Sequence, residues 1–138
     1  MAEVPSRNQD LEHLQLLSIF HYVVGCLAAL FSCLFLIHLG LGLAMLLAPE
    51  KFMDKQNPQG PPAFVGWLFT GIGGLAILFG WTFAGLIITA GRFLTKRKHY
   101  LFCLVMGAIA CLFMPFGTVL GVFTIIVLIR PSVKAMFI

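Results

Sequence analysis

The sequence predicts an all-α polytopic membrane protein with four transmembrane helices, a short N-terminal interfacial helix and a C-terminal helical hairpin. Three observations predict it: the composition, three long stretches without charge, and a proline and a glycine near the middle of the third stretch. Of the 138 residues, 60% are apolar and 10% are charged, against roughly 45–50% and about 25% in soluble domains. So few charges cannot cover the water-exposed surface of a small globular protein. We therefore expect residues 1–138 to form a single transmembrane domain.

The uncharged stretches lie between Glu12 and Glu50, between Lys55 and Arg92, and between Lys98 and Arg130. Each is longer than the roughly 20 residues that a helix needs to cross about 30 Å of hydrocarbon. Backbone N–H and C=O groups find no water there and must pair within the segment, which favours helices.

The N-terminal segment predicts a short interfacial helix over residues 10–20. Asp10 is a suitable N-cap, and Leu11, Leu14 and Leu17 share one face of that helix. The acidic residues before the apolar stretch are not typical of a secretory signal. The interfacial helix leads into a first crossing over residues 22–47.

A polar loop over residues 49–62 follows the first crossing. Its four prolines lack the N–H donors that either neighbouring helix would need. The second crossing is expected over residues 63–90, and residues 92–99 form a short basic connector.

The third stretch has 31 residues, so it fits either one kinked helix or a hairpin that turns at Pro115 and Gly117. The positive-inside rule separates the two. With a hairpin, seven cations lie on one side and two on the other; with one helix, the ratio is five to four. We therefore expect helices over residues 96–113 and 117–129, with both termini cytoplasmic. These helices are short, so local bilayer thinning or snorkelling side chains would accompany them.

Small residues recur at helical spacing, which favours close packing between helices in lipid. The candidate packing positions are Gly25, Ala28, Ser32, Gly66, Thr70, Gly73, Gly74, Gly80, Ala84, Gly117 and Gly121. Gly74 belongs to a second stripe in which Trp67 and Trp81 alternate with glycines, and we expect Gly74→Leu to disrupt packing more than Leu78→Ala. Packing within the four-helix unit and packing between subunits both fit, and the two are compatible.

Few residues could carry chemistry. His38, inside the first crossing, is a candidate for a polar path, and His21 and His99 are candidates for a bis-histidine haem near the cytoplasmic boundary. None of the four cysteines forms a CxxC pair, and no Asp or Glu lies within the crossings. We therefore expect neither enzymatic activity nor a cofactor or a metal.

The stretches 10–22 and 113–124, with Gly66-Trp67, Gly80-Trp81 and residues 130–134, resemble a group of small bacterial membrane proteins known only as hypothetical. The resemblance implies four helices in a bacterial cytoplasmic membrane and no particular activity.

The favoured hypothesis is a non-enzymatic packing, scaffold or accessory subunit that acts through its glycine-rich faces, as a homo-oligomer or within a larger membrane complex. Membrane lipid is the expected partner, and nucleic acid is not. The alternatives are a small channel or transporter for a neutral or weakly acidic solute, with His38 on its path, and a haem-binding electron-transfer subunit.

Overall fold

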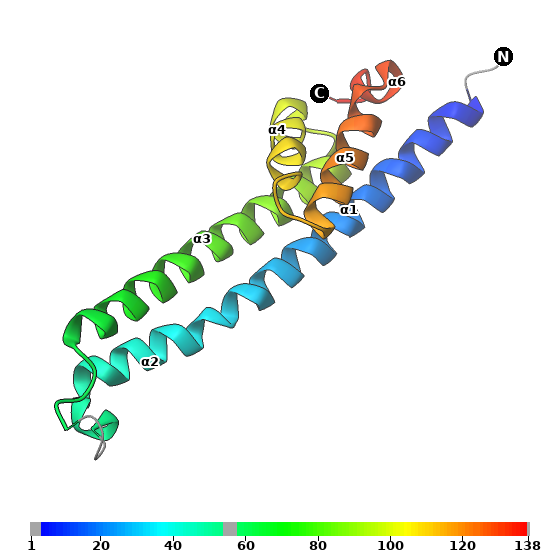
Figure 1. Ribbon diagram of the computed structural model, residues 1–138. Coiled ribbons are helices and arrows are strands. Elements are labelled where there is room, and N and C mark those ends of the chain that lie inside the picture. Colours follow the sequence, from blue (N-terminus) through cyan, green and yellow to red (C-terminus); the bar gives the residue numbers. More distant parts are fainter. Residues whose placement is uncertain (1–3, 54–57, 138) are drawn as a thin grey trace. The chain divides into compact units, whose positions relative to one another are not determined.

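The structure is a computed structural model that describes residues 4–53 and 58–137. This part of the chain is helical and contains no strand, which confirms the all-α prediction (Figure 1). Residues 54–57 of the predicted polar loop lie outside the described residues. The elements are α1 (Val4–Cys33), α2 (Phe35–Leu47), the short 3-10 helix η1 (Pro49–Phe52), α3 (Ala63–Lys96), α4 (Tyr100–Ala110), α5 (Phe116–Ile129) and α6 (Pro131–Lys134).

Two helical stretches, Arg7–Leu47 and Ala63–Lys96, are long and apolar enough to cross a membrane. In their most apolar windows only 11% and 17% of the residues are buried, whereas the core helix of a soluble protein is mostly buried. Helices α4 and α5 have 11 and 14 residues. At 1.5 Å per residue they measure about 16 and 21 Å, which is less than the hydrocarbon thickness of about 30 Å.

The first helix is continuous where the sequence predicts a boundary between an interfacial helix and a crossing. Helix α1 begins at Val4 and passes through residue 21 without interruption. No proline or glycine breaks its ladder there, so the separate helix over residues 10–20 is not formed. Asp10 consequently lies inside α1 and is not its N-cap. The interruption comes at Leu34, where 3-10-type hydrogen bonds run from Leu34 N to Phe31 O and from Ile37 N to Leu34 O.

Helix α3 continues to Lys96 instead of ending at residue 90, and α4 begins at Tyr100 instead of residue 96. The end of α3 has Schellman geometry, because Lys98 N donates to Phe93 O at 3.0 Å and Arg97 N donates to Leu94 O at 3.2 Å. Arg97 adopts φ 51° at the position where helices usually place glycine. A side chain in this left-handed region costs about 1–2 kcal/mol.

The chain divides into two compact units. The first unit contains Met1–Leu27 and Phe83–Ile138, and the second contains Ala28–Thr82. The core of the first unit is formed by buried apolar side chains: Leu14, Leu17, Leu94, Cys103, Leu120, Val127, Leu128 and Val133.

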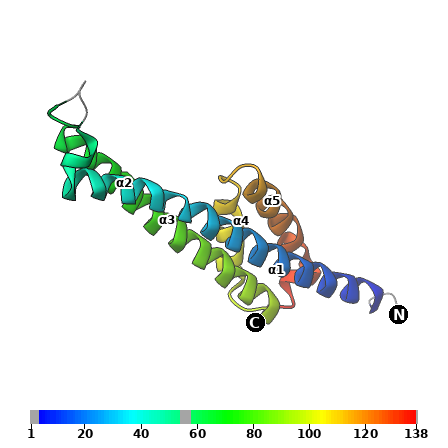
Figure 2. The ribbon, with the colours of Figure 1, turned by 90° about the horizontal axis from the view of Figure 1, so that it is seen from below.

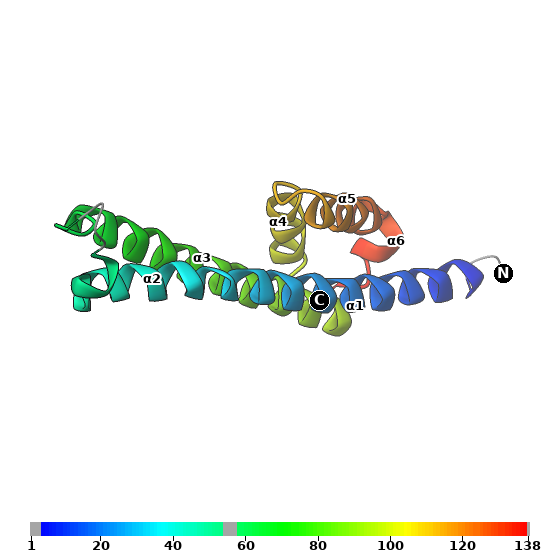
Figure 3. The ribbon, with the colours of Figure 1, turned by 60° about the horizontal axis from the view of Figure 1, so that its bottom comes forward.

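Helices α4 and α5 of the first unit pack against each other. The turn over residues 111–115 joins them (Figure 3). The Tyr100 hydroxyl donates to Leu128 O at 3.1 Å, so the start of α4 lies beside the end of α5. The chain therefore reverses its direction near Pro115.

In the second unit, α2 runs beside the first part of α3 (Figure 2). An ideal Cβ built on Gly42 would lie 2.5 Å from Thr70 N, and one on Gly73 would lie 2.7 Å from Leu39 N. These approaches bring the two backbones together, as small residues allow in membrane helices. Because Gly66 lies against Leu46 and Gly73 lies against Leu39, the two helices run antiparallel.

Candidate functional site

The inner face of α3 in the second unit carries three of the predicted packing glycines. A Cβ on Gly66 would lie 2.9 Å from Leu46 Cγ, and one on Gly80 would lie 2.5 Å from Ser32 Oγ. Ser32 is 4% exposed, and its hydroxyl lies within hydrogen-bond distance of two α3 carbonyls, Ile77 O at 3.2 Å and Ala76 O at 3.4 Å. Together with Gly73 and half-buried Thr70, these residues pack within the chain. Ala28 is also half-buried.

The predicted small residues of the first unit also face neighbouring helices. A Cβ on Gly25 would lie 2.6 Å from Ile88 Cγ1 of α3, and Ala84 beside it is buried. On α5, a Cβ on Gly117 would lie 2.5 Å from Ala110 O, and one on Gly121 would collide with the carbonyl of Gly107. The GxxxG sequence of α5 therefore faces α4 within the hairpin.

The second glycine stripe of α3 has different surroundings. Trp67 and Trp81 are 68% and 57% exposed. Within the described residues, no atom lies within 4 Å of a Cβ built on Gly71, and the corresponding contact of Gly74 is an ordinary 3.9 Å to Leu39 Cδ1. The close backbone contact at this level belongs to Gly73, which is itself one of the predicted packing positions, whereas the tight contact expected at Gly74 is absent from the described residues. We call the face formed by Trp67, Gly71, Gly74, Leu78 and Trp81 the outer α3 face.

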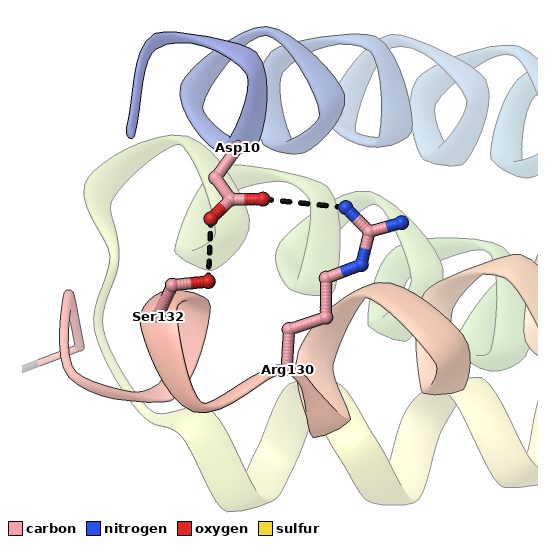
Figure 4. Close-up of polar contacts among 3 residues, drawn as sticks. All are labelled: Asp10, Arg130 and Ser132. Carbon is pink, nitrogen blue, oxygen red and sulfur yellow. Dashed lines mark hydrogen bonds and ion pairs between the residues drawn. The ribbon is translucent and has the colours of Figure 1, made fainter. Parts of the chain in front are cut away.

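A buried carboxylate joins the two ends of the described chain in the first unit (Figure 4). Asp10 is 4% exposed. Arg130 Nη1 lies 3.3 Å from Asp10 Oδ1, and the Ser132 hydroxyl donates to Asp10 Oδ2 at 2.5 Å. Charge-assisted bonds of this kind satisfy a carboxylate that would otherwise be costly to bury. No local pattern in the sequence indicates this cluster, because Asp10 is 120 residues away from Arg130 and 122 from Ser132.

The hydroxyls of Ser18 and Thr95 join α1 to α3. Ser18 Oγ donates to Gly91 O at 2.8 Å and lies 2.7 Å from Thr95 Oγ1. Each hydroxyl carries one hydrogen. Thr95 Oγ1 also donates to Gly91 O, at 3.2 Å, so either hydroxyl could be the donor in the bond between the two.

His21 follows on the same side of α1 and is 1% exposed. Its Nδ1 lies 2.9 Å from Leu17 O. Because a carbonyl only accepts hydrogen bonds, Nδ1 carries the hydrogen in this contact. Nε2 has no hydrogen-bond partner among the described residues and is closed off from solvent.

The two histidines considered for haem have different surroundings. His99 is exposed, and its ring lies 4.6 Å from that of Phe93, between ring centroids. His21, by contrast, is buried, with 1% of its surface exposed. Groups of three or more His, Cys, Asp or Glu side chains suited to a metal ion are absent from the described part of the chain.

His38, the candidate for a polar path, lies on the surface of the second unit. Its ring is exposed and stacks on Phe69 at 5.9 Å between centroids, with 16° between the ring planes. Phe35 lies against it at 5.6 Å. The structure thus surrounds His38 with aromatic side chains on one side and open surface on the other.

A cavity of about 200 Å³ lies in the first unit between residues 11–15 of α1 and the C-terminal end of α3. Its lining residues are Leu11, Leu14, Gln15, Leu94, Thr95 and Arg97. Leu14 and Leu94 are buried and form an apolar floor, whereas Gln15, Thr95 and Arg97 are exposed and form a polar rim.

Comparison with known proteins adds no relative, because no protein family model, no curated protein and no solved structure matches this chain.

Proposed function

We propose that this chain is a non-enzymatic membrane subunit that associates with another membrane helix through the outer α3 face. The observation that supports the proposal is the contrast between two glycines on one helix. Gly73 is pressed against the α2 backbone, whereas Gly71, two residues away, has open space where a side chain would be. Gly73 therefore packs within the chain, and Gly71 is available to pack against another membrane helix.

The energetics favour this interpretation. Glycine inside a helix costs about 0.8–1.0 kcal/mol relative to alanine, and Gly71 gains no close backbone contact within the chain in return. Helices in lipid associate mainly through van der Waals packing at small residues. Trp67 and Trp81 flank the gap with large exposed rings, which supply the contact area that a partner helix would cover.

The occupant that we propose is a second copy of this chain, inserted in the same orientation. The hairpin topology gives a strong asymmetry of basic residues, which opposes an antiparallel pair because one copy would have to insert upside down. In a parallel pair, each outer α3 face would meet the same face of its partner.

The same proposal includes four helical segments in a bacterial cytoplasmic membrane, with both termini in the cytoplasm. The stretches 7–47 and 63–96 cross the bilayer, and α4 and α5 enter it as a hairpin from the side of the basic connector. The contact of Asp10 with Arg130 and Ser132 supports this topology, because it brings the beginning of α1 and the end of α5 together. The shortness of α4 and α5 calls for local thinning of the bilayer.

Cysteine crosslinking in native membranes tests the association. In a chain whose native cysteines are replaced, we expect Gly71→Cys to give a product of twice the mass on mild oxidation, because the partner's Gly71 is its neighbour. Ile72→Cys is the matched control, since Ile72 is 52% exposed at the same depth but points about 100° away. Equal yields from the two variants would contradict the proposed interface.

Charge removal tests the orientation. Neutralising Lys96, Arg97 and Lys98 together removes three of the seven cations that the hairpin topology places in the cytoplasm. We expect the fraction of inverted molecules to rise, because the basic residues set the orientation. A C-terminal reporter that is active on only one side of the membrane measures this fraction, and an unchanged signal would count against the assigned topology.

A further inference from the structure

We propose that the cavity at the C-terminal end of α3 binds the headgroup phosphate of an anionic phospholipid. The cavity has about 200 Å³, several times the roughly 30 Å³ that one water molecule occupies in the liquid. It is smaller than the roughly 300–1,000 Å³ of sites for drug-sized ligands and cofactors. Its size therefore suits the phosphate of one lipid headgroup together with the adjoining glycerol.

The lining matches an amphiphile. Leu14 and Leu94 provide an apolar floor at 2% and 0% exposure, against which the glycerol and first methylenes of a lipid can lie. At the rim, the Thr95 hydroxyl and the Gln15 amide are both able to donate and to accept hydrogen bonds with a headgroup. The floor of the cavity is therefore apolar and its rim is polar.

Arg97 is the residue that selects for an anion. Its guanidinium presents paired donors that suit a phosphate. Within the described residues Arg97 has no carboxylate in ion-pair distance, because the one ion pair there joins Arg130 to Asp10. Glu12, the other acidic side chain on this part of α1, is exposed and also outside ion-pair distance.

The backbone at Arg97 provides a second observation. Its φ of 51° is strained for any residue with a side chain, and glycine would remove the strain. The arginine therefore occupies a position where its side chain is a burden to the fold, and at that position its side chain lines the cavity. The adjacent Lys96 and Lys98 add positive potential that favours anionic lipid at a cytoplasmic surface.

The test uses the purified full-length protein in a neutral detergent. Short-chain phosphatidylglycerol, short-chain phosphatidylcholine and inorganic phosphate are titrated separately, and the unfolding temperature and the lipids retained in native mass spectra are recorded. We expect phosphatidylglycerol to raise the unfolding temperature and to be retained. A similar effect of phosphatidylcholine, or of inorganic phosphate alone, would overturn the proposal of an anionic lipid.

Two variants localise the binding. Arg97→Gln should weaken phosphatidylglycerol binding about fivefold or more, as expected for a cation at a headgroup, whereas Lys98→Gln removes the same charge beside the cavity and should have a much smaller effect. Arg97→Gly relieves the strained backbone, so it should unfold no earlier than the wild type without lipid and still lose the phosphatidylglycerol response. Equal losses in the Arg97→Gln and Lys98→Gln proteins, or a retained response in the Arg97→Gly protein, would show that the cavity is not the site.

Discussion

Replacing Gly73 by leucine is expected to unfold the second unit, whereas replacing Gly71 by leucine leaves it folded. The two positions are separated by one residue on α3 and differ in their surroundings. A Cβ on Gly73 would lie 2.7 Å from Leu39 N and 3.2 Å from Phe35 O, both of which are backbone atoms that cannot rotate away. Helix α2 would have to move off α3 to make room.

The loss of stability in Gly73→Leu depends on which atoms the new side chain would overlap. Inserting methylenes into a well-packed core costs typically 1–3 kcal/mol, and occasionally more. Because the obstacle at Gly73 is backbone, we expect a loss of about 3 kcal/mol or more. Thermal unfolding in detergent, followed by the fluorescence of Trp67 and Trp81, measures this loss.

Gly71→Leu is the matched control and carries its own expectation. Open space surrounds Gly71 within the described chain, and leucine is a better helix former than glycine. The unfolding temperature of Gly71→Leu should therefore equal or exceed that of the wild type, while crosslinking between copies should fall. A large loss of stability in Gly71→Leu, or none in Gly73→Leu, would show that the faces of α3 are assigned incorrectly.

Removing the guanidinium at position 130 is expected to destabilise the first unit more than removing the whole ion pair. Arg130→Met leaves the Asp10 side chain, which is 6% exposed, with Ser132 as its remaining described partner. Breaking a fully buried pair costs about 3–5 kcal/mol. Because the Arg130 side chain is 44% exposed, water compensates part of the loss, and we expect about 2 kcal/mol.

Three further variants serve as references for the stability lost in Arg130→Met. The double variant Asp10→Leu/Arg130→Met should recover part of the loss, because it leaves no buried charge behind. Ser132→Ala should cost about 1 kcal/mol for one hydrogen bond. Arg92→Met removes an exposed arginine of the same unit and should change the free energy of unfolding by less than about 0.5 kcal/mol. If Arg130→Met is no worse than Arg92→Met, the ion pair does not hold the ends of the chain together.

The sequence predicted the helical class correctly because its long uncharged stretches must pair their backbone groups in an apolar solvent, and a helix makes all of these pairs within one segment. It also located the reversal near Pro115, where α4 ends and α5 begins after a short turn. The helix boundaries were less accurate. The expected break before residue 22 is absent and a break occurs at Leu34 instead. No proline or glycine marks that position, and it lies next to Ser32, whose hydroxyl lies against the α3 carbonyls.

The candidate sites were likewise predicted only in part. Periodicity identified the glycine stripes of α3 and named both Gly73 and Gly74 as packing positions, but of these two only Gly73 lies against a neighbouring backbone in the described residues. The pattern shows which residues share a face, but the rotation of a helix about its axis depends on the helix against which it packs. The strained backbone of Arg97 also leaves no mark in the sequence, because most helices that end in this conformation use glycine there.

The sequence alone predicts a helical chain, with three uncharged stretches that are each long enough to cross a membrane and with small residues arranged in faces. Those properties follow from composition and local spacing, which do not depend on how the helices pack against one another. Only the tertiary structure decided which glycines are covered, that Asp10 meets Arg130 and Ser132, and that Thr95 and Arg97 border one cavity. These are contacts between segments far apart in the chain, and their geometry arises only when the helices are packed together.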